Sequence, residues 1–151
     1  MSELEERLVE IIKSKSNEVG QKWYRDMQES QYLPTMHSIS EDEGMRMALT
    51  VYSNLGEWLK PGGSKDIKDT YRNFGHAMFH RGFLLEEVVM VLTLLKRYLW
   101  LTLLEMGLMT TDLNIYQTLE LNNKVVLYYD RGIYFALIGY KEAQTDSERR
   151  V

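Results

Sequence analysis

The stretch DLNIYQTLELNNKVVLYYDRGIYFALIGYKEA, residues 112–143, decides the fold because it is long and contains no proline. It predicts one helix of roughly thirty residues, longer than a compact domain of this size needs. Along it, steps of four and three residues alternate between seam positions, as at the a and d positions of a coiled coil, and Asn122 is the one polar member. The predicted seam consists of Ile115, Leu119, Asn122, Val126, Tyr129, Ile133, Ala136 and Tyr140.

Two interpretations of this seam are open. The helix can simply line the core of its own domain, since many core helices mimic heptads over a few turns. Alternatively, Leu121, Val125 and Tyr128 pack inward while part of the seam meets the same helix of a second copy, with a buried Asn122 fixing the register. The second interpretation predicts a homodimer whose interface contains the eight seam residues.

The rest of the chain is divided into four further helices by caps and breakers. Two capping boxes, which begin at Ser2 and Ser40, start the first and second helices. Ser64 is expected to cap the third helix, which Gly82 ends. The fourth helix ends at Gly107 and is apolar nearly all round, so we expect it at the centre of the fold.

We therefore predict an all-α fold, a five-helix bundle with a long C-terminal helix. A chain of 151 residues has the usual length of one domain. We place that domain at residues 1–143 and expect residues 144–151, which are polar, to form a flexible tail.

Composition argues against several classes of protein. The chain has no cysteine, which excludes disulfides, thiolate metal sites and cysteine nucleophiles, and its acidic N-terminus is unlike an export signal. These features fit the cytoplasm. The net charge of −4 and the scattered basic residues argue against nucleic acid as a partner. The most apolar stretch, residues 84–104, is interrupted by four charged residues, so we interpret it as a core helix rather than a membrane span.

His76 and His80 are the residues most like a site. They lie four apart on the predicted third helix, a spacing that suits two imidazole ligands of a transition metal. They fall on the same side as Asp69, opposite the apolar stripe of the helix, and a metal site would need such a carboxylate as a third ligand. The sequence HAMFH lacks the glutamate of a zinc protease, and no phosphate-binding glycine loop or catalytic triad signature is present, so an enzyme is disfavoured.

Tyrosine and methionine are abundant, with ten and nine residues. Core packing explains most of them, and a flexible cavity for a small apolar ligand is the alternative. Such a cavity is expected among Tyr71, Met78, Leu92 and neighbouring apolar residues.

The segment FGHAMFHRGFLLEEVV, residues 74–89, resembles the N-terminal domain of RsbR/RsbRD-type stressosome co-antagonists, a domain also found ahead of bacterial sensor histidine kinases. With Trp23 in the opening helix and the long final helix, the resemblance covers essentially the whole chain. These domains are similar to sensor globins. The resemblance therefore implies a globin-like fold and a non-enzymatic role as the sensory or regulatory domain of a bacterial signal-transduction protein.

The same resemblance bears on haem. In haem-binding globin-coupled sensors the iron-ligating histidine lies three residues after one glycine and four before the next, and that spacing from Gly75 and Gly82 lands on Met78. The expected histidine is absent, and His76 and His80 lie on the wrong face. A lone methionine is a poor anchor for haem. The resemblance thus implies a haem-free domain; if haem or another ligand does occupy the core, Met78 and Tyr71 are the residues expected to contact it.

In proteins of this kind the domain dimerises through its last helix, which continues into a downstream output domain or contacts a signalling partner. Three classes of function remain: a haem-free regulatory dimerisation module, a sensor that carries haem or another small ligand in its core, and an enzyme or metal protein centred on His76 and His80. We favour the first.

Overall fold

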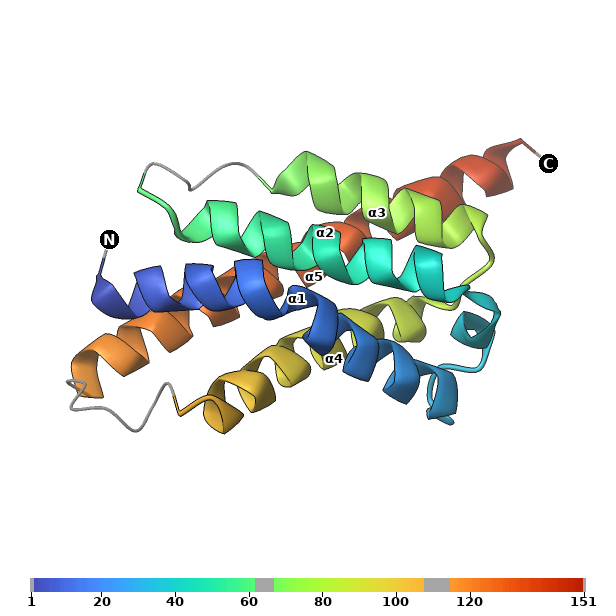
Figure 1. Ribbon diagram of the computed structural model, residues 1–151. Coiled ribbons are helices and arrows are strands. Elements are labelled where there is room, and N and C mark those ends of the chain that lie inside the picture. The colour runs from blue at the N-terminus through green and yellow to red at the C-terminus, as the bar shows by residue number, and fades with distance from the viewer. Residues whose placement is uncertain (1, 62–66, 108–114, 151) are drawn as a thin grey trace.

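The computed structural model describes residues 2–61, 67–107 and 115–150. This part of the chain forms five α-helices and one short 3-10 helix, without any strand (Figure 1). In chain order the elements are α1 (Glu3–Glu29), η1 (Thr35–Ser38), α2 (Glu41–Leu59), α3 (Lys68–His80), α4 (Leu85–Glu105) and α5 (Ile115–Arg149). The predicted all-α fold with a long C-terminal helix is confirmed.

The two predicted capping boxes differ. Ser2 and Glu5 form a complete one: the Ser2 hydroxyl accepts from the Glu5 amide at 3.1 Å, and the Glu5 carboxylate accepts from the Ser2 amide at 3.3 Å. At α2 only half of the box forms. The Ser40 hydroxyl accepts from the Glu43 amide at 3.2 Å, but the Glu43 carboxylate pairs with Arg81 instead of turning back to the helix end.

The glycine stop after α3 is confirmed. Gly82 has a φ of +80°, a left-handed conformation that favours glycine, and the Phe83 amide donates to the Met78 carbonyl at 3.1 Å to close the helix end. The predicted cap at Ser64 lies outside the described residues; α3 begins at Lys68 with Ile67 as its N-cap.

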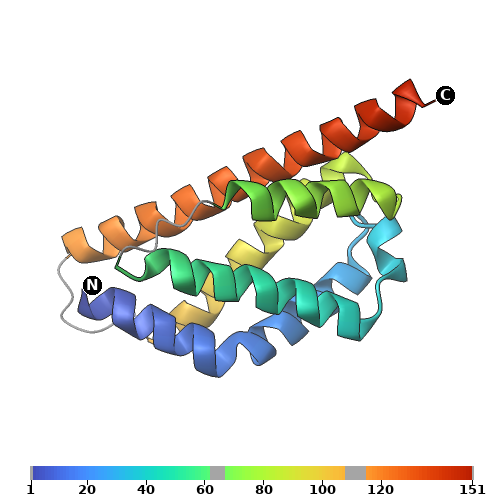
Figure 2. The same ribbon diagram turned by 90° about the horizontal axis from the view of Figure 1, so that it is seen from above.

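The most extensive helix contact joins α3 to α5, which lie side by side in both views (Figures 1 and 2). Two glycines permit it. A Cβ atom added at Gly75 would lie 2.0 Å from the Ala136 carbonyl oxygen, and one added at Gly139 would lie 2.0 Å from the Arg72 carbonyl oxygen. The two backbones therefore touch directly, with no room for even a methyl group on either side.

The predicted dimer seam on α5 is only partly available to a second copy of the chain. Tyr129, Ala136 and Tyr140 are buried in the core of their own chain, so they are core residues and not a free surface. Ile115 and Leu119, by contrast, are 71% and 55% exposed. The remaining members, Asn122, Val126 and Ile133, are half-buried. Of the seam residues, Ala136 and Tyr140 lie where α5 meets α3.

Two further expectations need correction. Residues 144–149, predicted as part of a flexible tail, continue α5 as exposed helix, since neither glycine nor proline follows Ala143 to end it. The helix α4 is not surrounded along its whole length. One face is buried from Glu87 to Leu103, but Leu101 and Leu104 are 39% and 58% exposed.

Candidate functional site

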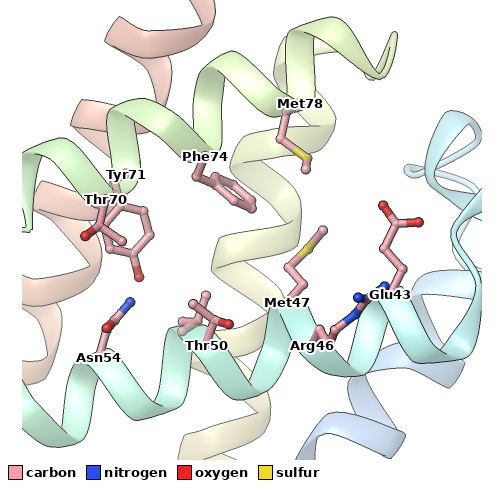
Figure 3. Close-up of a pocket in the computed structure, with 10 residues that line it drawn as sticks. Glu43, Arg46, Met47, Thr50, Asn54, Thr70, Tyr71, Phe74 and Met78 are labelled. Carbon is pink, nitrogen blue, oxygen red and sulfur yellow. The ribbon is translucent and has the colours of Figure 1, made fainter.

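A pocket of about 250 Å³ opens between α2 and α3 (Figure 3). It exists because each of these helices packs mainly on another one: α2 on α1, and α3 on α5. Side chains rather than backbone contacts fill the space between them. The lining residues are Glu43, Arg46, Met47, Thr50, Val51 and Asn54 from α2, and Thr70, Tyr71, Phe74 and Met78 from α3.

Helical spacing places these side chains on facing surfaces. On α2 the lining positions recur every three or four residues, and on α3 Thr70, Phe74 and Met78 follow one another at steps of four. Each set therefore forms one stripe along its helix, and the two stripes face each other across the pocket (Figure 3).

The pocket changes character along its length. Met47, Phe74 and Met78 project into its middle and make an apolar section (Figure 3). Thr50, Asn54 and Thr70 lie towards one end, where they offer hydroxyl and amide groups.

Glu43 and Arg46 give the other end its charge (Figure 3). The Glu43 carboxylate forms an ion pair with Arg81, which follows α3, and this pair bridges the two helices at the charged end. Arg46 is exposed and has no hydrogen-bond or ion-pair partner in the described part of the chain. Arg46 is therefore available to pair with an anionic group at this end of the pocket.

Tyr71 connects the pocket to the interior. It lines the pocket, yet it is only 2% exposed, and its hydroxyl oxygen lies 2.5 Å from that of Tyr128 on α5. The Tyr128 hydroxyl donates its single proton to the Val51 carbonyl of α2 at 2.8 Å, so Tyr71 must be the donor to Tyr128. This chain of hydrogen bonds ties α3, α5 and α2 together behind the pocket.

Burial keeps these tyrosines neutral. It raises the pKa of Tyr71 and the pKa of Tyr128 far above the ordinary phenol value, because the charged form would lose its hydration. Both hydroxyls therefore stay protonated at any physiological pH, and the connection is a neutral hydrogen-bond chain. The Tyr71 ring also packs on Gly132 of α5, where an added Cβ would lie 3.1 Å from it.

Two of the residues predicted around a cavity, Tyr71 and Met78, line the pocket from α3, and no α2 residue was predicted there. Tyr71 and Met78 do lie in one cavity, but Leu92 does not line it; Leu92 is buried in the core. Met47, Thr50 and Asn54 were missed because they do not belong to the apolar stripe of α2. The signal that marks them is a second, mixed polar and thioether stripe beside that one.

The histidines lie elsewhere. His76 is half-buried and His80 is exposed, and neither lines the pocket. No third ligand joins them: within the described ranges, no group of three or more histidine, cysteine, aspartate or glutamate side chains is arranged to hold a metal ion. On α5, Glu142 is held by Arg72 of α3 in a two-bonded ion pair at 2.6 and 2.9 Å.

The pocket does not fit haem. No histidine lines it, and Met78 is its only residue at the position where the resemblance places the iron ligand. Its volume of about 250 Å³ exceeds the roughly 150 Å³ of a cavity that binds a benzene ring, so one substituted ring can be enclosed in it. A smaller ligand suits the geometry better.

Comparisons of the chain with protein families, with curated proteins and with solved structures found no match. Among the described helices, none is both long and apolar enough to cross a membrane.

Proposed function

We propose that this chain is a non-enzymatic sensory domain of a signal-transduction protein, in which a small ligand binds between α2 and α3 and the signal leaves through α5. The observation that carries the proposal is the double role of Tyr71. One side chain lines the pocket and also contacts Tyr128 and Gly132 of α5. A ligand that shifts Tyr71 must therefore change the packing of the output helix.

The α3–α5 contact supports transmission over a longer distance. Because Gly75 and Gly139 bring the two backbones together, α3 cannot shift without either moving α5 or breaking that contact. The Arg72–Glu142 ion pair adds a second link near the C-terminal end of α5. A ligand needs only to favour one of two packings of α3 on α5 to act as a switch.

The last turns of α5 suit an output surface. They extend beyond the other helices (Figure 2), and residues 144–150 are all exposed. The resemblance to RsbR/RsbRD-type sensor domains predicted an output through this helix, to an attached domain or a separate partner protein. The globin-like character of the bundle is part of the same proposal.

We place the homodimer surface on a different face of α5 from the predicted seam. Tyr116, Leu127 and Tyr134 are exposed apolar residues, and at 3.6 residues per turn they fall on one line along the helix. Self-association along this line would bring the two output helices together.

The dimer surface can be tested by placing charges on it. Leu127→Glu with Tyr134→Glu should convert a dimer into a monomer in size-exclusion chromatography with light scattering. Tyr32→Glu, at an exposed tyrosine in the loop between α1 and η1, is the control and should leave the mass unchanged.

A non-enzymatic role is supported by the pocket chemistry. Among the described residues that line the pocket there is no histidine, and the one acid, Glu43, is engaged by Arg81. The walls therefore supply shape and hydrogen bonds rather than a group free to move a proton.

The coupling can be tested by removing one hydroxyl. Tyr71→Phe keeps the pocket wall but loses the hydrogen bond to Tyr128, so we expect faster hydrogen–deuterium exchange in α5, at residues 128–143. The matched control is Tyr24→Phe, which removes the hydrogen bond from Tyr24 to the Ile39 carbonyl, 2.7 Å long, on another part of the domain. If exchange in α5 responds to neither change, or equally to both, the proposed coupling is wrong.

A further inference from the structure

The chemistry of the pocket walls narrows the class of ligand. The middle section is formed by one aromatic ring and two thioethers, from Phe74, Met47 and Met78. Methionine sulfur packs favourably against aromatic rings, and flexible methionine side chains adapt to the shape of a bound molecule. The pocket is also small, with a volume of about 250 Å³ that lies just below the range of about 300–1,000 Å³ for sites of small organic ligands. These features suit one aromatic ring with a short side chain.

The charged side chains at one end of the pocket indicate which group the ligand carries there. The Glu43 carboxylate pairs with Arg81, so among the described residues that line the pocket the Arg46 guanidinium is the charged group without an ion-pair partner. A guanidinium presents several N–H donors in a planar fork that matches a carboxylate. The opposite end, at Thr50, Asn54 and Thr70, is uncharged and can accept or donate hydrogen bonds to a neutral substituent on the ring.

We propose that the ligand is a small aromatic monocarboxylate, with its ring between Phe74 and the two methionines and its carboxylate at Arg46. This inference rests on the proposed sensory role of the pocket and adds the identity of the ligand class. Binding would compensate the free charge of Arg46 and place the ring beside Tyr71, the residue that contacts α5.

The test uses 3-phenylpropionate and its uncharged amide, 3-phenylpropanamide, as probes of the full chain. Binding is followed by titration in two-dimensional ¹H–¹⁵N NMR, which also maps the site. We expect the acid to shift the signals of α2 and α3 residues around the pocket and to bind about tenfold more tightly than the amide, the usual effect of one charge-assisted hydrogen-bonded contact.

Three variants sharpen the result. Arg46→Gln should weaken binding of the acid about tenfold and leave binding of the amide unchanged. Arg25→Gln, at an exposed arginine of α1 outside the pocket, should change neither. Thr50→Phe adds a ring at an exposed position of the pocket wall and should abolish binding of both probes without disturbing the core.

Several outcomes would overturn the ligand class: no binding of either probe, equal binding of acid and amide, or shifts centred on other helices. Failure of the proposed sensory role can be distinguished from failure of the proposed ligand class. If the acid binds in the pocket as described but hydrogen–deuterium exchange in α5 does not change, the ligand class stands and the signalling role fails.

Discussion

The two sides of α3 differ sharply. On one side, α3 and α5 meet backbone to backbone through Gly75 and Gly139, and no added atom fits between them. On the other side, α3 faces α2 across a pocket of about 250 Å³. We call the side of α3 that contacts α5 its clamped side, and the side that faces α2 across the pocket its open side. A shift of the α3 backbone towards or away from the pocket would therefore either move α5 or break the Gly75–Gly139 contact.

The largest loss of stability is expected when the contact between α3 and α5 is disrupted. Gly75→Ala and Gly139→Ala each place a Cβ against a carbonyl oxygen of the opposite helix, and we expect each to lower the free energy of unfolding by about 3 kcal/mol or more. Gly56→Ala is the matched control, since a Cβ there has its nearest neighbour 3.8 Å away; it should raise stability by about 0.5–1 kcal/mol. Urea unfolding measures all three. Equal behaviour of the three variants would mean that α3 and α5 do not meet in this way.

The next effect compares two adjacent tyrosines. Tyr128→Phe leaves the buried Tyr71 hydroxyl without an acceptor and removes the second hydrogen bond to the Val51 carbonyl, which still accepts within α2, so it should cost about 2 kcal/mol. The hydroxyl of Tyr129 is also buried but has no hydrogen-bond partner in the described structure. Tyr129→Phe removes an unsatisfied polar group and should leave stability unchanged or increase it. A larger loss for Tyr129→Phe in the same urea titration would contradict the hydrogen-bond assignment.

These residues show how far the sequence could lead. Local signals, such as the capping box at Ser2 and the glycine stop at Gly82, predicted helix ends correctly because they act within a few residues. The role of Gly75 and Gly139, by contrast, depends on two helices that are far apart in the sequence and meet only in the folded chain. Before the structure, Gly139 could only be read as a weak point in a long helix.

The predicted seam failed in part for a related reason. Heptad spacing shows that one face of α5 is covered, but not whether the cover is α3 of the same chain or a second copy. Likewise, Tyr71 and Met78 could be grouped because they share an apolar stripe, whereas the facing wall of Met47, Thr50 and Asn54 depends on how α2 is placed by α1.

A smaller effect is expected from the ion pair at the edge of the clamped side. The hydrogen bonds from Arg72 lower the pKa of Glu142 below its ordinary value. A carboxylate with a lowered folded pKa adds stability above its unfolded pKa of about 4.3, and this contribution is lost as the pH falls through the folded value. Glu142→Gln should therefore flatten the stability profile below about pH 4.3. Glu120→Gln, at an exposed glutamate of α5, should retain the slope of the natural chain. Parallel profiles for the two variants would show that the pair contributes nothing.

The smallest effect is expected on the open side of α3. Thr70 is exposed and lines the pocket on the same helix as Gly75. Thr70→Phe adds a whole ring, yet we expect the free energy of unfolding to change by no more than about 0.5 kcal/mol, because the ring can enter the pocket without displacing packed atoms. Gly75→Ala adds one methyl group and should cost several times more. If Thr70→Phe were as damaging as Gly75→Ala, α3 would be packed equally on both sides, and the pocket could not act as an input to α5.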